Sequence, residues 1–174
     1  MHTTEGIILS KTPSGEADEL VTMYTCAYGK VRALVQGVKK EEAKLRGHLE
    51  VLSLCTIGLV AGKNGERLVY AELKNFWSRI RTHAGKHYAA HYMVRRMDNA
   101  CFPGERDERM WTLLTAAFII LEEQDFTTRE LQDFLLGFEK QLVAHLGYGD
   151  AGIGSTLGPL VAQGTLARYT GSGA

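Results

Sequence analysis

The spacing of apolar residues changes once along this chain of 174 residues, close to Trp77. Before that point, short runs rich in β-branched residues alternate with glycine and charged turns, which is the pattern of strands. After it, apolar residues recur every three or four positions, which is the period of amphipathic helices. This order predicts an α+β protein, with strands in the first part of the chain and helices in the second.

Five strands are predicted before Trp77, and most of them are joined by short turns. They cover residues 5–11, 20–26, 30–36, 49–60 and 67–73. In the third strand, apolar residues at every second position place Arg32 on the face opposite the core. The turn at 62–65 contains Asn64-Gly65, a strong signal for a hairpin. Five such strands favour a small barrel or sandwich.

Three helices are predicted after Trp77. They cover residues 80–101, 105–123 and 127–146. The last begins with a capping box, Thr127 to Glu130, and Gly147 stands where a C-terminal cap belongs. We therefore expect a barrel domain at 1–77, a helical domain at 78–149 and a Gly-rich, poorly ordered tail at 150–174.

The charge of the chain is unevenly distributed. The 20 basic and 20 acidic residues give a net charge of zero. Residues 1–81 carry 12 basic and 9 acidic residues, whereas residues 82–150 carry 7 and 11. This pattern argues against a wholly basic nucleic-acid-binding protein, but it allows a local basic site on the predicted barrel.

Secreted and membrane proteins are disfavoured. The N-terminus lacks the basic and apolar stretches of a signal peptide. The longest nearly uncharged apolar run, residues 51–61, is far shorter than the roughly 20 residues that cross a bilayer. Cys26, Cys55 and Cys101 are widely separated and form no C-x-x-C, so neither a disulfide framework nor a zinc ribbon is predicted. We expect a cytoplasmic protein without membrane contact.

A cluster of basic residues is the most informative feature for function. If residues 5–76 form a barrel, the cluster falls on one strand face and its connecting loops, where such barrels bind single strands. Bases also need flat side chains to stack on, for which Tyr24, Tyr28 and Tyr70 are candidates. The alternative is a solvated loop in which Glu41 and Glu42 screen the lysines. The predicted DNA-binding residues are Lys30, Arg32, Lys39, Lys40, Lys44, Arg46, Lys63 and Arg67.

Neither a metal site nor a catalytic site is predicted. His83, His87 and His91 follow one another at intervals of four, so two of them could face one ion. The third would lie ~12 Å from the first along the helix axis, and a polar stripe is the better interpretation. No phosphate-binding loop, nucleophile elbow or carboxylate pair is complete. We expect a protein that is not an enzyme and needs no cofactor.

Several segments, in this order, resemble the RecO family of bacterial recombination mediators. They are TEGIIL at 4–9, GEADELVT at 15–22, YGKVRALVQG at 28–37, KLRGHLEVLS at 44–53 and FExxLxxxLGYG at 138–149. The resemblance implies an OB-fold barrel followed by a helical domain. It also implies a nucleoid-associated DNA repair protein that binds and anneals single-stranded DNA. Its implied partners are the single-strand binding protein (SSB), RecR and, indirectly, RecA, which it helps to load on SSB-coated strands.

The resemblance also extends to individual positions. Lys30, Arg32, Lys39, Lys40, Lys44 and Arg46 match the basic positions of the family's N-terminal segment. In the family the helical domain binds the acidic, aromatic-ended tail of SSB, for which the predicted contacts here are Arg79, Arg81, Arg95 and Arg96.

One departure from the family and two other hypotheses remain. Many family members continue into a cysteine-bearing zinc segment, whereas residues 150–174 are Gly-rich and contain no Cys, so we expect a short form without that site. The first alternative is an adaptor on the same fold that binds the SSB tail or RecR and has little DNA binding. The second is a metal-dependent enzyme that uses the histidines.

Overall fold

The computed structural model describes residues 1–37, 49–63 and 65–148. They form two compact units. The first unit contains Met1–Trp77 together with Val94–Asp107, and the second contains Ser78–Met93 and the described residues from Glu108 onward. The helical domain expected at 78–149 is therefore divided between the two units, because residues 94–107 group with the strands.

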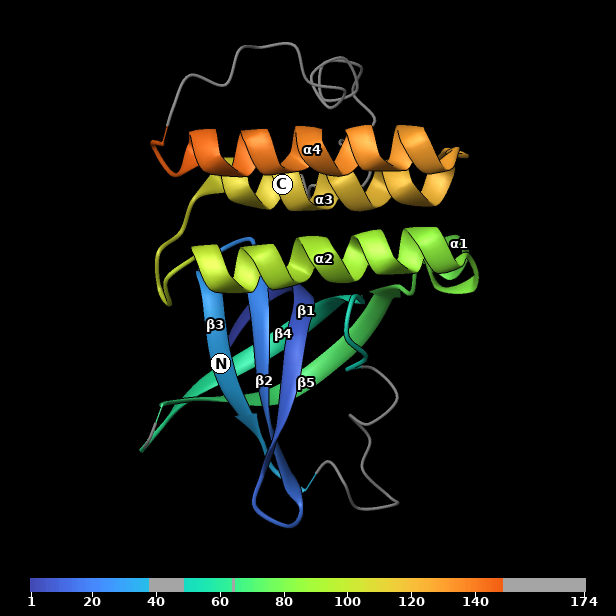
Figure 1. Cartoon of the computed structure of the whole chain (residues 1–174). Coiled ribbons are helices and arrows are strands. Elements are labelled where there is room, and N and C mark those ends of the chain that lie inside the picture. Colours follow the sequence, from blue (N-terminus) through green and yellow to red (C-terminus); the bar gives the residue numbers. More distant parts are fainter. Residues whose placement is uncertain (38–48, 64, 149–174) are drawn as a thin grey trace, which may run out of the picture. The chain divides into compact units, whose positions relative to one another are not determined.

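Five strands of the first unit close into a barrel (Figure 1). The order around the barrel is β1-β2-β3-β5-β4, with β3 and β5 parallel and all other neighbours antiparallel. The closed barrel confirms the barrel alternative of the sequence prediction and agrees with the OB-fold that the family resemblance implies. The strands are β1 (His2–Ser14), β2 (Asp18–Thr25), β3 (Gly29–Val35), β4 (Leu54–Gly62) and β5 (Gly65–Asn75).

Three strands differ clearly in length from their predictions, and one of them, β5, covers Gly65–Asn75 rather than 67–73. β1 is longer than 5–11 because it pairs with two neighbours, β4 along residues 2–7 and β2 along residues 6–14. β4 begins at Leu54 rather than at residue 49. Leu52, two residues before it, has a positive φ of 78°, which lies outside the φ range of regular strands. The predicted hairpin is present, since Gly62 pairs with Gly65.

The core of the first unit lies inside the barrel. On β3 the buried residues alternate with exposed or half-buried ones, as the sequence predicts, and Arg32 faces outward. Deleting one such buried aliphatic side chain typically costs about 2–5 kcal/mol of folding free energy. The fully buried members include Ile8, Val21, Met23, Ala33, Val35, Leu49, Cys55 and Ile57.

The helices are α1 (Ser78–Thr82), α2 (Ala84–Ala100), α3 (Glu108–Glu123) and α4 (Thr128–His145). The prediction of one helix over 80–101 is wrong, because the helix is interrupted at His83. The Nδ1 atom of His83 accepts a hydrogen bond from the Lys86 N–H in the first turn of α2. The start predicted at residue 105 is also wrong, because residues 102–107 lie outside the helices, against the barrel. No helix among the described residues is long and apolar enough to cross a membrane.

The capping box of α4 is confirmed. The Thr127 hydroxyl accepts a hydrogen bond from the Glu130 N–H at 3.3 Å, and the Glu130 carboxylate accepts one from the Thr127 N–H at 2.7 Å. The hydrogen bonds that the Glu130 carboxylate accepts from the Thr127 N–H and from the Thr127 hydroxyl lower the pKa of Glu130. At the other end of the helix, Gly147 takes a positive φ of 85° directly after the C-cap residue Leu146, as expected.

Candidate nucleic-acid interface

The outer face of β1, β2 and β3 is partly covered by residues 98–107, which we call the strap. The strap consists of the last turn of α2 and the connection to α3, and it belongs to the same compact unit as the barrel. Its anchor is Asp98, whose carboxylate lies 2.7 Å from the ammonium of Lys30 and accepts a hydrogen bond from the Ser10 hydroxyl at 3.3 Å. Further along, the Gly104 N–H donates to the Lys30 carbonyl at 2.9 Å.

Gly29 is the point of closest approach between the barrel and the strap. A Cβ atom at this position would lie 2.0 Å from the carbonyl oxygen of Glu105. Gly29 also has a φ of 64°, a conformation that side chains with a Cβ rarely adopt. Both facts require glycine here, and they explain how the strap can lie directly on the backbone at the start of β3.

The strap removes one of the three predicted stacking residues. Tyr24 is 1% exposed, and its hydroxyl donates a hydrogen bond to the Asp107 carbonyl at 3.2 Å. Burial raises the pKa of Tyr24 well above its usual value. The expectation that Tyr24 offers an exposed ring to a base is therefore wrong, because the ring is enclosed by the chain itself.

Lys30 is also engaged by the strap. Its side chain is 12% exposed, and its ammonium donates to the backbone carbonyl of Asp98 as well as pairing with the Asp98 carboxylate. The Lys30 ammonium, which the sequence predicts to bind a phosphate of DNA, thus pairs with the Asp98 carboxylate in this structure. Lys30 has a clear role in holding the strap.

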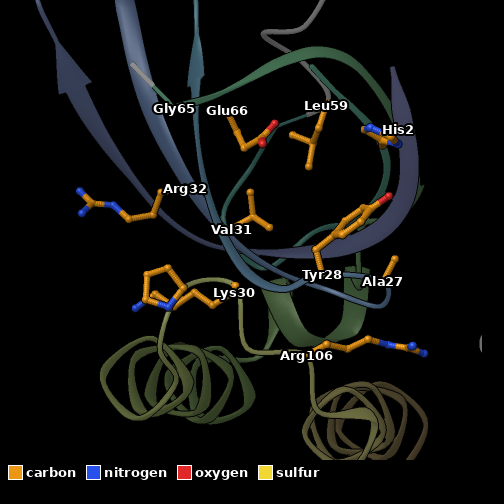
Figure 2. A pocket seen from close by; sticks show the side chains of 12 residues that line it. His2, Ala27, Tyr28, Lys30, Val31, Arg32, Leu59, Gly65, Glu66 and Arg106 are labelled. Atoms are coloured by element: carbon orange, nitrogen blue, oxygen red, sulfur yellow. The ribbon is translucent and has the colours of Figure 1, made fainter. Parts of the chain in front are cut away.

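A pocket of about 510 Å³ opens beside the strap, where β3 and β5 diverge (Figure 2). The two strands pair through only two residue pairs, at Ala33 and Leu34 of β3. The apolar floor of the pocket is formed by Val31 and Leu59, whose side chains point into it. Its volume lies within the range of about 300–1,000 Å³ that sites for small ligands occupy.

One wall of this pocket is aromatic. The ring of Tyr28 lies in the loop between β2 and β3 and is 38% exposed. It meets the ring of His2 at a centroid distance of 6.2 Å and an angle of 69°. An exposed ring above an apolar floor is the kind of surface on which a base stacks. Among the three tyrosines considered from the sequence, only Tyr28 lines the pocket.

Two arginines stand at the rim of the pocket and extend outward from different sides of it (Figure 2). Arg32 is exposed on β3, where the alternation of β3 predicts it. Arg106 comes from the strap, and its Nε atom donates to the Cys26 carbonyl at 3.2 Å, which fixes the stem of the side chain. Sequence reasoning missed Arg106, because it stands alone among acidic residues and reaches the barrel only through the fold.

The remaining predicted DNA-binding residues divide into two groups. Lys63 is exposed in the β4–β5 turn, and Arg67 is exposed on β5 with its guanidinium donating to the Gln36 side chain. The others, Lys39, Lys40, Lys44 and Arg46, lie outside the described residues. The third stacking candidate, Tyr70, is exposed on β5 and donates to Glu72 at 3.1 Å.

The four arginines predicted to bind a partner are not gathered on one unit. Arg79 and Arg81 lie in α1 of the second unit, whereas Arg95 and Arg96 lie in the part of α2 that belongs to the first. The guanidinium of Arg79 is bound to Asp125 and to the Glu123 carbonyl.

The three histidines at intervals of four have different surroundings. His83 caps α2 through its Nδ1 atom, as described above. The rings of His87 and His91 contact each other edge to face at 4.6 Å. Within residues 1–37, 49–63 and 65–148, no group of three or more His, Cys, Asp or Glu side chains is arranged to hold a metal ion.

The barrel order and the helices that follow it define the class of this protein, an OB-fold domain with a helical extension. The family model described as "Recombination protein O N terminal" matches residues 1–76. Several curated relatives carry the name DNA repair protein RecO. The relative from Gloeothece citriformis is 36% identical over 89 residues, which are 51% of this chain and 31% of the relative. The relative from Moorella thermoacetica is 29% identical over 147 residues, which are 80% of this chain and 54% of the relative.

Residues 1–76 thus match the N-terminal part of the RecO family, and the relatives named DNA repair protein RecO align with most of the chain beyond them. A further relative, from Roseiflexus sp., is 27% identical over 151 residues, 85% of this chain and 50% of the relative. The relatives from Moorella thermoacetica and Roseiflexus sp. align with most of this chain, and the chain spans about half the length of each of them.

Proposed function

We propose that this protein binds single-stranded DNA at the pocket between β3 and β5, as part of DNA repair and recombination. The observation that carries the proposal is the combination of an aromatic wall, an apolar floor and two exposed arginines at one opening of an OB-fold barrel. A base stacks on Tyr28, and the phosphates on either side of it are neutralised by Arg32 and Arg106. Such a site binds strands of any sequence, because every base has a flat face.

The strap determines the route of the strand. OB-folds commonly bind oligonucleotides across β2 and β3 and the adjoining loops. Here Tyr24 and Lys30, which pair with each other across β2 and β3, both contact the strap. The strand therefore crosses the barrel on the β5 side, where Lys63 and Arg67 extend the positive surface. The proposal also includes four basic residues that lie outside the described part of the chain and are supported by the sequence alone, namely Lys39, Lys40, Lys44 and Arg46.

The proposal includes the mediator activities that the family resemblance implies. Annealing two strands needs neutralised phosphates and accessible bases but no bond chemistry, so the protein acts without catalytic residues. Loading of RecA on SSB-coated strands would involve the SSB tail and RecR as partners, in the bacterial cytoplasm at the nucleoid. The division of the four arginines between two units favours Arg79 and Arg81 as one contact and Arg95 and Arg96 as another.

A second candidate function is supported by the same pocket. An apolar floor between two arginines also matches an acidic peptide with an aromatic end, as expected for an adaptor that binds the SSB tail. The carboxylate of Glu66, which lines the pocket, repels acidic side chains and phosphates alike, so it does not separate the two candidates. The exposed ring of Tyr28, on which a base of any strand can stack, favours DNA.

Fluorescence anisotropy with labelled oligo-dT at low salt tests the proposal. We expect binding by the wild-type chain and at least a tenfold decrease in affinity for Arg32→Glu combined with Arg106→Glu. Arg129→Glu, on the exposed surface of α4, is the matched control and should bind like the wild type. The proposal fails if the wild type does not bind, or if the double variant binds like the control. Binding of an SSB tail peptide without binding of DNA would establish the adaptor instead.

A further inference from the structure

We infer that Glu66 makes the pocket selective among bases, favouring guanine over thymine at one position of a bound strand. The inference rests on the proposed function, because it assumes that the pocket receives a base. Stacking on Tyr28 and the contacts to phosphates do not distinguish one base from another, whereas a contact to Glu66 does.

The backbone of Glu66 is held in place by the barrel, and its side chain is exposed. It lies near the start of β5 and pairs with Ala33 of β3 and with Ala61 of β4. This is the point where β3 and β5 meet before they diverge to form the pocket. The Glu66 side chain points toward Leu59, across the pocket from the ring of Tyr28 (Figure 2). A base stacked on Tyr28 therefore presents its edge toward this carboxylate.

The surroundings of Glu66 make a hydrogen bond to it selective. Among the described residues, its carboxylate has no hydrogen-bond or ion-pair partner that would have to be displaced. The neighbouring side chains of Val31 and Leu59 are apolar, so a base that enters the pocket replaces water near the carboxylate. Hydrogen bonds to a charged group are stronger than those between neutral groups, and more so where water is excluded.

The bases differ in what they can offer to a carboxylate, which is an acceptor only when ionised. Guanine carries an N–H and an amino group side by side on its Watson–Crick edge, and these match the two carboxylate oxygens. Cytosine and adenine offer one amino group each. Thymine offers one N–H between two carbonyl oxygens, which would face the negative charge. The expected order is guanine first, cytosine and adenine next, and thymine last.

The inference is tested with oligo-dT of about 15 nucleotides, a length that one OB domain can cover. Competition anisotropy compares this strand with strands in which one central thymine is replaced by guanine or by hypoxanthine, which has the N–H but lacks the amino group. We expect the guanine strand to bind about fivefold to 150-fold more tightly than oligo-dT, the range of one good bidentate contact to a base. The hypoxanthine strand should lie between the two.

Glu66→Gln should abolish the preference, since an amide has only one acceptor oxygen and no charge. Glu16→Gln is the matched control: it removes the same charge from the exposed β1–β2 turn, outside the pocket, and should keep the preference. Equal binding of the three strands by the wild type, or an unchanged preference in Glu66→Gln, overturns the inference while DNA binding stands. Failure of the wild type to bind any strand overturns the proposed function as well.

Discussion

The ammonium of Lys30 lies 2.7 Å from a carboxylate oxygen of Asp98, a residue 68 positions further along the chain. This pair fastens the strap to the barrel and engages one cation of the predicted DNA-binding set. Both side chains are largely shielded, with 12% and 29% of their surface exposed. We therefore expect Lys30 to contribute more to stability than to the proposed DNA binding.

Lys30→Ala should lower the free energy of unfolding by about 2 kcal/mol, because it leaves the Asp98 carboxylate partly buried without its partner. Arg32→Ala, on the same strand but facing outward, should change it by about 0.5 kcal/mol or less. Urea denaturation followed by circular dichroism measures both. Equal stability of the two variants would show that the strap is not held by this pair.

Arg32 and Arg106 should each neutralise one phosphate. For single strands, the slope of log affinity against log salt concentration changes by about 0.7 for each phosphate that is no longer neutralised. Arg32→Ala and Arg106→Ala should each make the slope shallower by this amount, and the double variant by about twice as much. Arg129→Ala serves as the control with an unchanged slope. Slopes identical to the wild type in all variants would place the phosphates elsewhere.

Gly29→Ala should be more destabilising than Gly15→Ala, although both glycines have a positive φ. At Gly15 nothing lies within 4 Å of a new Cβ, so the cost is about 1–2 kcal/mol from the backbone conformation alone. At Gly29 the new methyl group also collides with the Glu105 carbonyl, and the strap must move. Thermal denaturation should give a clearly lower midpoint for Gly29→Ala. Similar midpoints for the two variants would mean that the strap does not contact this turn.

Thr127→Ala should remove the capping box and cost about 1 kcal/mol of stability. Because the pKa of Glu130 is lowered in the folded state, its part of the cap is present above the ordinary carboxyl pKa and is lost as the pH falls through the lowered value. An NMR titration of Glu130 should show its pKa rising in Thr127→Ala. Thr128→Ala, one position later, should leave the Glu130 pKa where it is in the wild type.

The existence of the five strands could be predicted because their signals are local. Alternating apolar residues on β3, glycine turns and the 62–65 hairpin each act over a few residues. The number and spacing of the strands favoured a barrel or a sandwich, and the OB-fold was implied only by the family resemblance. The capping box at Thr127 and the glycine after α4 were equally predictable, since a cap involves only the first or last turn of a helix.

The strap and the pocket could not be predicted in the same way. Asp98 lies within the helix that the sequence predicts over 80–101, and no neighbouring residue indicates that it pairs with Lys30. The burial of Tyr24 and the placement of Arg106 depend on the same long-range contact. The divergence of β3 from β5, which opens the pocket and exposes Glu66 to it, is a property of the closed barrel and not of either strand.

The central claim is that a single strand of DNA binds at the opening between β3 and β5. The most direct measurement is the change in backbone amide NMR signals of the ¹⁵N-labelled full chain as oligo-dT is added. We predict that the largest changes cluster at Tyr28, Arg32, Glu66 and Arg106 and spare α4. Changes that are confined to the helices of the second unit, or an absence of any change at saturating oligo-dT, would contradict the claim.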